Sequence, residues 1–396
     1  MTTGRPEVDH PRLSVDFRLP PPVEAFRDQL RAWLADNLTD EVRDAARRRG
    51  TDDHALATLR SWDRTMAEAG WAAISWPVEC GGRGAGALEQ LVFTEETIAA
   101  GAPTPVNVIG INNIAPAIMQ YGTERQKREL LPRMVRADDI WCQGMSEPDA
   151  GSDLASLRTR AVRDGDDFVV TGQKTWTSNG HRADWCALFV RTNPDAPKHR
   201  GISCLVVDMR LPGIQARPLR TLTGDAEFAE VFFDAVRVPA SALLGPLDGG
   251  WAVATSTLGH ERAGAARLYA MIRLRLRDLV EDLRAAERRR LVDLDDPLVL
   301  ARLGELDTRL AFLAVLCQRA ISAGGDASGS ASLAKTVWGE LEQDVAALGH
   351  DVLGAHDPGG RWSIARLSTR SLTIAGGTTQ VNKNVTAQRV LGLPRR

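Results

Sequence analysis

CQGMSEPDAGSDLASLRTRA, residues 142–161, is the stretch on which the interpretation of this 396-residue sequence depends. It combines glycines, hydroxyl side chains and acidic residues, and it lies where the pattern of the chain changes. Before Ile140, apolar residues recur at helical spacing. After it, short runs rich in β-branched and aromatic residues alternate with turn residues. Taken alone, such a stretch would be a polar loop that links two domains.

The first third of the sequence is predicted to be helical. Helical spacing of apolar residues predicts one helix after the prolines at 20–22 and another before Gly70. Further helices are predicted over 89–100 and 112–120. A capping box that starts at Thr123 begins the next helix.

The rest of the chain divides into a β-rich part and a second helical part. The runs FVVTG, WCALFVRT, GISCLVVDM and AEFAEVFFDAVRVP predict strands. From Trp251 onward long helices return, with a predicted loop at Ala323–Ser332. The predicted organisation is an N-terminal extension 1–20, a helical domain 21–138, a β domain 139–246 and a helical bundle 247–396.

Composition excludes several classes of protein. Hydrophobic residues make up 43% of the chain and charged residues 25%, which is typical of a globular protein and not of collagen, a coiled coil or a disordered chain. The 49 basic and 51 acidic residues leave a net charge of -2. Such a chain has no net positive charge to attract the phosphates of a nucleic acid. Five of the basic residues are lysines, and the arginines are spread along the chain.

Cysteine and hydropathy patterns indicate a cytoplasmic protein. The five cysteines are odd in number and form no CxxC pair, as expected in a reducing compartment. The first twenty residues contain no apolar core of a signal peptide, and no uncharged apolar run reaches the roughly 18 residues of a membrane span. We therefore expect a soluble, unprocessed protein that does not act at a membrane.

Several common signatures are absent or out of context. GGRGAG at 81–86 follows a predicted helix rather than a strand, so we interpret it as a turn and not as a dinucleotide loop. The seven histidines are scattered without metal-ligand spacing, and no GxSxG elbow occurs. The sequence predicts neither a metal site nor a serine hydrolase.

Two further segments are informative in combination with residues 142–161. GQKTWTSNG, residues 172–180, places a tryptophan beside two hydroxyl residues at the end of a predicted hairpin. A lone tryptophan is more often a core residue than a cofactor platform. IAGGTTQVNKNVTAQRVLGLPRR, residues 374–396, predicts a turn followed by the start of a helix.

Together, and in this order, the three segments closely resemble the flavin-dependent acyl-CoA dehydrogenase family. GMSEPDAGSD matches the first signature of the family, and GGTTQ followed by AQRVLGLPR matches its C-terminal one. The resemblance extends from about residue 22 to Arg396. It implies a mainly α fold with a middle β domain: an N-terminal helical domain, a β-barrel-like middle domain and a C-terminal four-helix bundle. FAD would lie between the β domain and the bundle.

The resemblance also implies a reaction and a cofactor site. The reaction is removal of the α proton and the β hydride of an acyl thioester to give a trans-2-enoyl thioester, with electrons passed to an electron-transfer flavoprotein. Such an enzyme would act in fatty acid metabolism on acyl-CoA or on an acyl-carrier thioester. The residues that the resemblance assigns to FAD are Gln143, Gly144, Met145, Ser146, Ser152, Trp176, Thr177, Ser178, Thr378 and Gln380.

The catalytic base departs from the commonest family pattern. Many members have the catalytic glutamate at the position that is Gly376 here. A minority place it on the first long bundle helix, in the Glu-Arg pair that is Glu261 and Arg262 here. We therefore predict Glu261 as the base and the Gly376 N–H as a donor to the thioester oxygen, although a lone helix glutamate is ordinarily a surface residue. The predicted substrate contacts are Ser152, His260, Arg262 and Gly377.

A second departure concerns assembly. Family members commonly carry an Arg-x-x-Phe-Gly stretch whose arginine reaches the FAD pyrophosphate of a partner subunit. This chain has AAERRRLVDLDDP at 285–297, where Arg288, Arg289 or Arg290 could substitute. The expected state is a homotetramer or homodimer, with one chain of a mixed complex as the other choice. A flavin monooxygenase or oxidase of the same fold and a non-catalytic partner chain remain as alternative functions.

Overall fold

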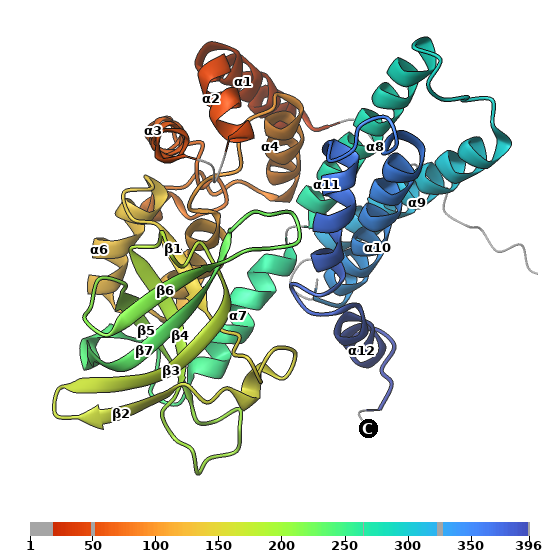
Figure 1. Ribbon diagram of the computed structural model, residues 1–396. Helices are drawn as coiled ribbons and strands as arrows, with labels where there is room; N and C mark the ends of the chain where they lie inside the picture. The colour runs from red at the N-terminus through yellow and green to blue at the C-terminus, as the bar shows by residue number, and fades with distance from the viewer. Residues whose placement is uncertain (1–18, 49–51, 264, 323–327, 395–396) are drawn as a thin grey trace, which may run out of the picture.

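A computed structural model describes residues 19–48, 52–263, 265–322 and 328–394 of the protein. The side chains of residues 258–266, 320–328 and 330 lie outside this description. Almost all of the predicted extension 1–20 lies outside it as well. The described chain has a helical part, a β part and a second helical part in sequence order (Figure 1).

The N-terminal part is helical, as the apolar spacing predicts. Helix α1 starts at prolines that suit a first helical turn, and it buries Phe26 and Leu30 in the same cluster as Trp62 of α3. The capping box at Thr123 is confirmed, because its hydroxyl accepts from Gln126 N–H and the Gln126 side chain accepts from Thr123 N–H. The elements are α1 (Pro21–Asn37), α2 (Asp40–Arg47), α3 (Asp53–Glu68), η1 (Val78–Cys80), α4 (Ala87–Ala99), the π turn η2 (Gly110–Ile114), α5 (Ala115–Tyr121) and α6 (Glu124–Val135).

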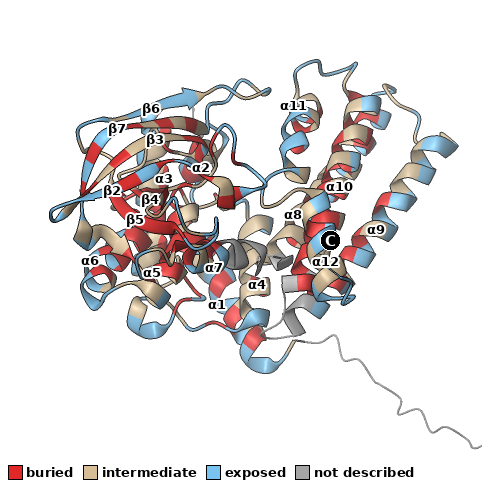
Figure 2. Cartoon of the chain, turned by 90° about the horizontal axis from the view of Figure 1, so that it is seen from below, coloured by how far each residue is buried: buried red, intermediate tan, exposed pale blue. Residues whose placement is uncertain are grey.

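The middle part is a sheet whose strand order is β6-β7-β3-β2-β4-β5-β8, with β1 paired in parallel with β4. Successive side chains of β4 face two different clusters: Phe189 packs toward the helices, and Leu188 packs with residues of β3 and β7. The strands therefore enclose a core of their own while one face supports the helices. Buried residues concentrate there, and β6 lies more exposed at the edge (Figure 2). The strands are β1 (Trp141–Gly144), β2 (Arg160–Asp164), β3 (Asp167–Ser178), β4 (Trp185–Arg191), β5 (Ile202–Asp208), β6 (Ile214–Leu219), β7 (Phe228–Pro239) and β8 (Leu243–Leu244).

The C-terminal part is a helical bundle. Apolar side chains of α8, α9 and α10 form its core, which includes Leu279, Leu313 and Leu341. Helices α8 to α11 lie beside the rest of the molecule, and α7 runs along the sheet (Figure 1). The elements are α7 (Gly250–Ala263), α8 (Ala265–Arg288), α9 (Pro297–Ser322), α10 (Ser328–Leu353), α11 (Arg361–Ser368), η6 (Thr369–Thr373) and α12 (Thr379–Arg389).

Helix α7 joins the three parts of the chain. The Ser256 hydroxyl donates to the Gln120 side chain of α5 at 2.9 Å. At the start of the helix, Gly250 lies so close to Ser203 of β5 that a Cβ would be 2.6 Å from the Ser203 carbonyl carbon. The same helix packs against α10. Its position is thus fixed from three sides.

The predicted loop at Ala323–Ser332 is partly wrong, because α10 already begins at Ser328. The reason is tertiary packing, which overrides the low helical propensity of the small residues. Ser332 is fully buried, and Gly329 faces Val390 so closely that a Cβ would be 2.2 Å from its Cγ2. The first residues of the predicted loop, 323–327, lie outside the described residues.

Two further features bear on the expected environment of the protein. The five cysteines are free thiols, and all but Cys80 are buried. Within the described ranges, every helix is too short or too polar to cross a membrane.

A buried asparagine ties the N-terminal helices to the first strand. Asn107 is 1% exposed, its side-chain oxygen accepts from Trp141 N–H at 2.8 Å, and its amide donates to the Met134 carbonyl at 2.8 Å. The side chain thereby satisfies two backbone groups that would otherwise be buried without partners.

We expect Asn107→Ala to lower the free energy of unfolding by about 2 kcal/mol, since it orphans these two groups. Urea denaturation followed by tryptophan fluorescence measures the change. Asn112→Ala, at an exposed neighbouring position, is the control and should stay within about 0.5 kcal/mol of wild type. Equal midpoints for the two variants would contradict the bridging role.

Candidate functional site

Strand β1 brings the first signature segment to helix α7. The Gln143 side-chain amide donates to the Thr257 hydroxyl at 3.2 Å, and Thr257 is 1% exposed. Position 261 follows Thr257 by four residues, and residues four apart share one face of an α-helix. The segment and the predicted base position therefore lie on the same side of α7. The side chains of His260, Glu261 and Arg262 lie outside the described residues.

An ion pair is buried behind this segment. Lys174 of β3 is fully buried, and its Nζ lies 2.8 Å from Glu147 Oε1. Glu147 also accepts the N–H groups of Arg158 at 2.6 Å and Thr159 at 2.8 Å. Burial raises the pKa of Glu147, but Lys174 and the two amides outweigh it and leave the pKa below its usual range. Burial lowers the pKa of Lys174, against the opposing charge of Glu147.

The remaining residues of the segment differ in what holds them. Gly144 is required by packing, because a Cβ would be 2.8 Å from Leu188 Cδ1. Met145 and Ser146 are half-buried, and the Met145 carbonyl accepts from Lys174 Nζ at 3.0 Å. Ser152 is exposed.

Trp176 lies at an irregularity in the pairing of β3 with β7. Its φ of 56° is in the left-handed region, which is a rare and strained conformation for a bulky residue. The side chain is 61% exposed and contacts Phe228 edge-on, with ring centroids 5.9 Å apart. An exposed tryptophan on a strained backbone is typical of a ligand platform and not of a core residue.

Thr177 and Ser178, both of which are predicted to bind FAD, differ in burial. Thr177 is fully buried inside the β part, opposite Ala229, whereas Ser178 is only half-buried. Neighbouring residues of a strand point to opposite faces, so the two hydroxyls lie on opposite faces of β3. The Thr177 hydroxyl has no hydrogen-bond partner among the described residues, which marks it as an interior polar group.

The C-terminal signature forms a tight turn before α12. Gly376 has φ 66° and Gly377 has φ 90°, both in the region that glycine tolerates best. Two buried side chains hold the Gly377 carbonyl: Lys335 Nζ at 2.7 Å and Asn382 Nδ2 at 2.7 Å. Thr378 caps α12 by accepting from Val381 N–H at 3.1 Å. Gln380 is exposed in the first turn of the helix.

The structure thus brings some of the predicted residues together and leaves others apart. The 143–147 segment, β3 and α7 are joined by direct hydrogen bonds. The turn at 376–378 is bonded to α10 and α12, and in the described part of the chain no hydrogen bond links it to the 143–147 segment. Lys174, Glu147, Thr257 and Lys335 were not predicted, because a polar residue that becomes buried has no periodic signal in the sequence.

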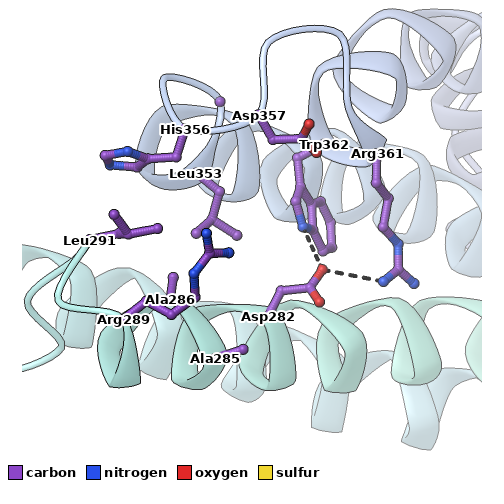
Figure 3. A pocket seen from close by; sticks show the side chains of 11 residues that line it. Asp282, Ala285, Ala286, Arg289, Leu291, Leu353, His356, Asp357, Arg361 and Trp362 are labelled. Carbon is purple, nitrogen blue, oxygen red and sulfur yellow. Dashed lines mark hydrogen bonds and ion pairs between the residues drawn. The ribbon is translucent and has the colours of Figure 1, made fainter.

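A separate pocket of about 360 Å³ opens between α8 and α11 (Figure 3). It is lined by Arg289, one of the arginines considered as a substitute for the missing phosphate contact. Its lining is balanced in charge, since Asp282 and Asp357 accompany Arg289 and Arg361. Asp282 is already engaged by Trp362 Nε1 at 2.9 Å and by Arg361 at 3.2 Å. Such a lining does not favour a pyrophosphate.

Metal chemistry finds no support in the described residues, which contain no group of three or more histidine, cysteine, aspartate or glutamate side chains suited to a metal ion. The candidate site is instead made of backbone amides, hydroxyls, one exposed indole and buried cations. These groups suit an organic cofactor with polar edges.

Comparison with known sequence families identifies the class. The N-terminal, middle and C-terminal domain models of acyl-CoA dehydrogenase match residues 21–138, 142–236 and 248–391. The chain belongs to the acyl-CoA dehydrogenase family of flavoprotein oxidoreductases. Members of this family generally bind FAD.

Individual relatives match over nearly their whole length. Acyl-CoA dehydrogenase IpdE1 of Mycobacterium tuberculosis is 39% identical over 385 residues, which cover 94% of this chain and 98% of the relative. The structure of the ChsE4-ChsE5 complex from Mycobacterium tuberculosis matches with a TM-score of 0.82 at 35% identity, covering 96% of this chain and 100% of that one. The Tcur3481-Tcur3483 steroid ACAD matches with a TM-score of 0.83 at 31% identity and the same coverage.

We expect the stability lost in Glu147→Gln to depend on pH. Folding lowers the pKa of Glu147. The carboxylate therefore contributes fully to the free energy of unfolding above its pKa in the unfolded chain, about 4.3, and this contribution is lost as the pH falls through its pKa in the folded protein. The difference in free energy of unfolding between wild type and variant should therefore narrow below about pH 4.3.

Urea denaturation at a series of pH values from about 7 to about 3 measures this difference. Glu129→Gln, which removes an exposed partner of Arg125, is the control and should show a small difference at every pH. A Glu147→Gln difference that stays constant or widens on acidification contradicts the assignment.

Proposed function

We propose that this acyl-CoA dehydrogenase oxidises the Cα–Cβ bond of a steroid-derived acyl-CoA thioester to the trans-2-enoyl thioester, with FAD as cofactor and Glu261 as base. Electrons leave to an electron-transfer flavoprotein. The observation that carries the proposal is the hydrogen bond from Gln143 to Thr257, which joins the signature segment to the helix of the predicted base.

The residues present fit a flavin. Trp176 offers an exposed aromatic face, and the half-buried Ser178 follows two positions later on the same face of β3. The Ser146 and Thr378 N–H groups have no acceptor among the described residues, so both are free to donate to a cofactor. When bound, FAD supplies the acceptor for the β hydride. Gln143, Gly144, Met145, Ser146, Ser152, Trp176, Ser178, Thr378 and Gln380 are the residues proposed to hold it.

Glu261 takes the α proton in this proposal. A solvated carboxyl with a pKa of about 4.3 is too weak a base for this carbon acid, so the site has to raise that pKa by desolvation. Gly376 has no side chain that would occupy the space of the substrate, and it keeps a backbone N–H for the thioester oxygen. One well-placed donor of this kind contributes about 3 to 4 kcal/mol of enolate stabilisation. Ser152, His260, Arg262 and Gly377 are the proposed substrate contacts.

The substrate class and the assembly rest on the relatives. One matching structure is a steroid ACAD, and two are formed by pairs of differently named chains. A second, different chain also suits this sequence, because the Arg-x-x-Phe-Gly stretch is missing and the pocket beside Arg289 is balanced in charge. Phe312 and Val315 are 53% and 61% exposed and lie about one turn apart on α9, where a partner chain could cover them.

Anaerobic titration with a panel of acyl-CoA thioesters tests the reaction and the substrate class. We expect the flavin absorption to bleach with a steroid-derived thioester and to change little with straight-chain thioesters of similar concentration. Reduced protein should then be reoxidised by an electron-transfer flavoprotein and only slowly by air. Rapid reoxidation by air would indicate an oxidase or monooxygenase, and colourless protein would indicate a non-catalytic partner chain.

Glu261→Gln should abolish enoyl product while leaving FAD bound, since the amide keeps the shape of the side chain and removes its basicity. Product is measured by mass spectrometry and bound FAD by absorption. Glu281→Gln, on the exposed face of α8, is the matched control and should retain turnover. Turnover retained by Glu261→Gln would refute the base assignment.

A further inference from the structure

Two of the five lysines of this chain are buried, and both donate to a backbone carbonyl next to a signature residue. Lys174 is 0% exposed and donates to the Met145 carbonyl at 3.0 Å. Lys335 is 7% exposed and donates to the Gly377 carbonyl at 2.7 Å. The two lysines come from different parts of the fold, β3 and α10.

The geometry of the peptide bond connects each lysine to an amide on its other side. The Met145 carbonyl shares its peptide with the N–H of Ser146, and the Gly377 carbonyl shares its peptide with the N–H of Thr378. In a planar trans peptide, C=O and N–H point in opposite directions. A lysine that holds the carbonyl from the interior therefore aims the N–H away from the interior.

Both of these N–H groups are left without an acceptor. Within the residues that the structure describes, no backbone or side-chain atom accepts from Ser146 N–H or from Thr378 N–H. The neighbouring groups are satisfied: the Ser146 carbonyl accepts from Thr175 N–H at 2.9 Å, and the Thr378 hydroxyl accepts from Val381 N–H. An unpaired amide beside a fully bonded carbonyl is suited to donate to a bound molecule.

We propose that Lys174 and Lys335 are positioning residues of the cofactor site, each fixing one peptide so that its N–H donates to FAD. The inference rests on the proposed function, because it needs FAD as the acceptor. A cation on the carbonyl oxygen also polarises the peptide and strengthens its N–H as a donor. The lysines act through these peptides and touch neither substrate nor cofactor.

Different side chains accompany the two buried lysines. Lys174 is balanced by the buried Glu147, which is itself held by two amides. Lys335 shares its carbonyl with Asn382, which is fully buried and donates to the same oxygen. In both places a compact ammonium with three donors fits where a planar guanidinium would need more room.

The surface lysines provide matched controls. Lys198 pairs at 2.9 Å with Asp153, the last residue of the first signature, and is about half exposed. Lys383 lies on α12 directly after Asn382 and is 3.7 Å from Glu340. Among the described residues, neither donates to a backbone carbonyl of the signature segments, so their removal tests the loss of a lysine without the loss of a held peptide.

The experiment compares Lys174→Met and Lys335→Met with Lys198→Met and Lys383→Met as purified holoproteins. We expect each buried variant to bind FAD about tenfold more weakly, which equals about 1.4 kcal/mol, and each control to bind within about twofold of wild type. In hydrogen-deuterium exchange, FAD should protect peptides that contain Ser146 and Thr378 in wild type but not in the corresponding variant.

The midpoint potential of the bound flavin separates positioning from a purely structural role. If Lys174→Met weakens a donor that favours reduced FAD, the midpoint potential should fall. The expected fall is about 30 mV for each tenfold loss in the preference of the site for reduced over oxidised FAD. Should Lys174→Met fold poorly because Glu147 is left unpaired, the double variant Lys174→Met/Glu147→Gln removes both charges and carries the same expectation.

Unchanged FAD affinity, potential and exchange protection in both buried variants would overturn the inference while leaving the proposed function intact. A wild-type protein that binds no FAD would overturn the proposed function and the positioning role with it.

Discussion

The packing of helix α7 between the other parts of the chain is the constraint on which the candidate site depends. The helix contacts α5, β5 and α10, which belong to three different parts of the chain. The side chain of Thr257 then becomes a fixed anchor for Gln143 at the end of β1. Each of these elements is packed in its own part of the fold, so the site residues that they carry are held in defined positions.

Much of the site consists of backbone held in place by buried polar side chains. Asn107, Glu147, Lys174 and Asn382 each bond main-chain groups. Every one of these side chains is desolvated, so each would be costly without its partners. These buried side chains thereby fix the backbone conformation of the signature segments through hydrogen bonds. The strained backbone of Trp176 is tolerated in the same surroundings.

Sequence reasoning recovered the elements whose patterns are local. Apolar spacing identified α1 and α3 and predicted helices from Trp251 onward, and the two signatures identified the family. It missed short or polar strands such as β6, whose residues alternate too weakly to stand out. It assigned the same role to Thr177 and Ser178, because adjacent letters carry no information about which face of a strand each residue occupies. It found neither Lys174 nor Lys335, since their partners lie far away in the chain and only folding brings them together.

The burial of Lys174 and Lys335 has a consequence for the chemical reactivity of the folded protein. Amine-directed reagents react with an accessible amine in its neutral form, and the lysine side chains at the surface are Lys127, Lys198 and Lys383. Lys383 lies in the C-terminal signature segment and Lys198 pairs with Asp153 of the first one, but in the described part of the chain none of the three donates to the carbonyl of Met145 or Gly377. Labelling of the folded protein through lysine would therefore modify these three side chains and leave the buried Lys174 and Lys335 unmodified.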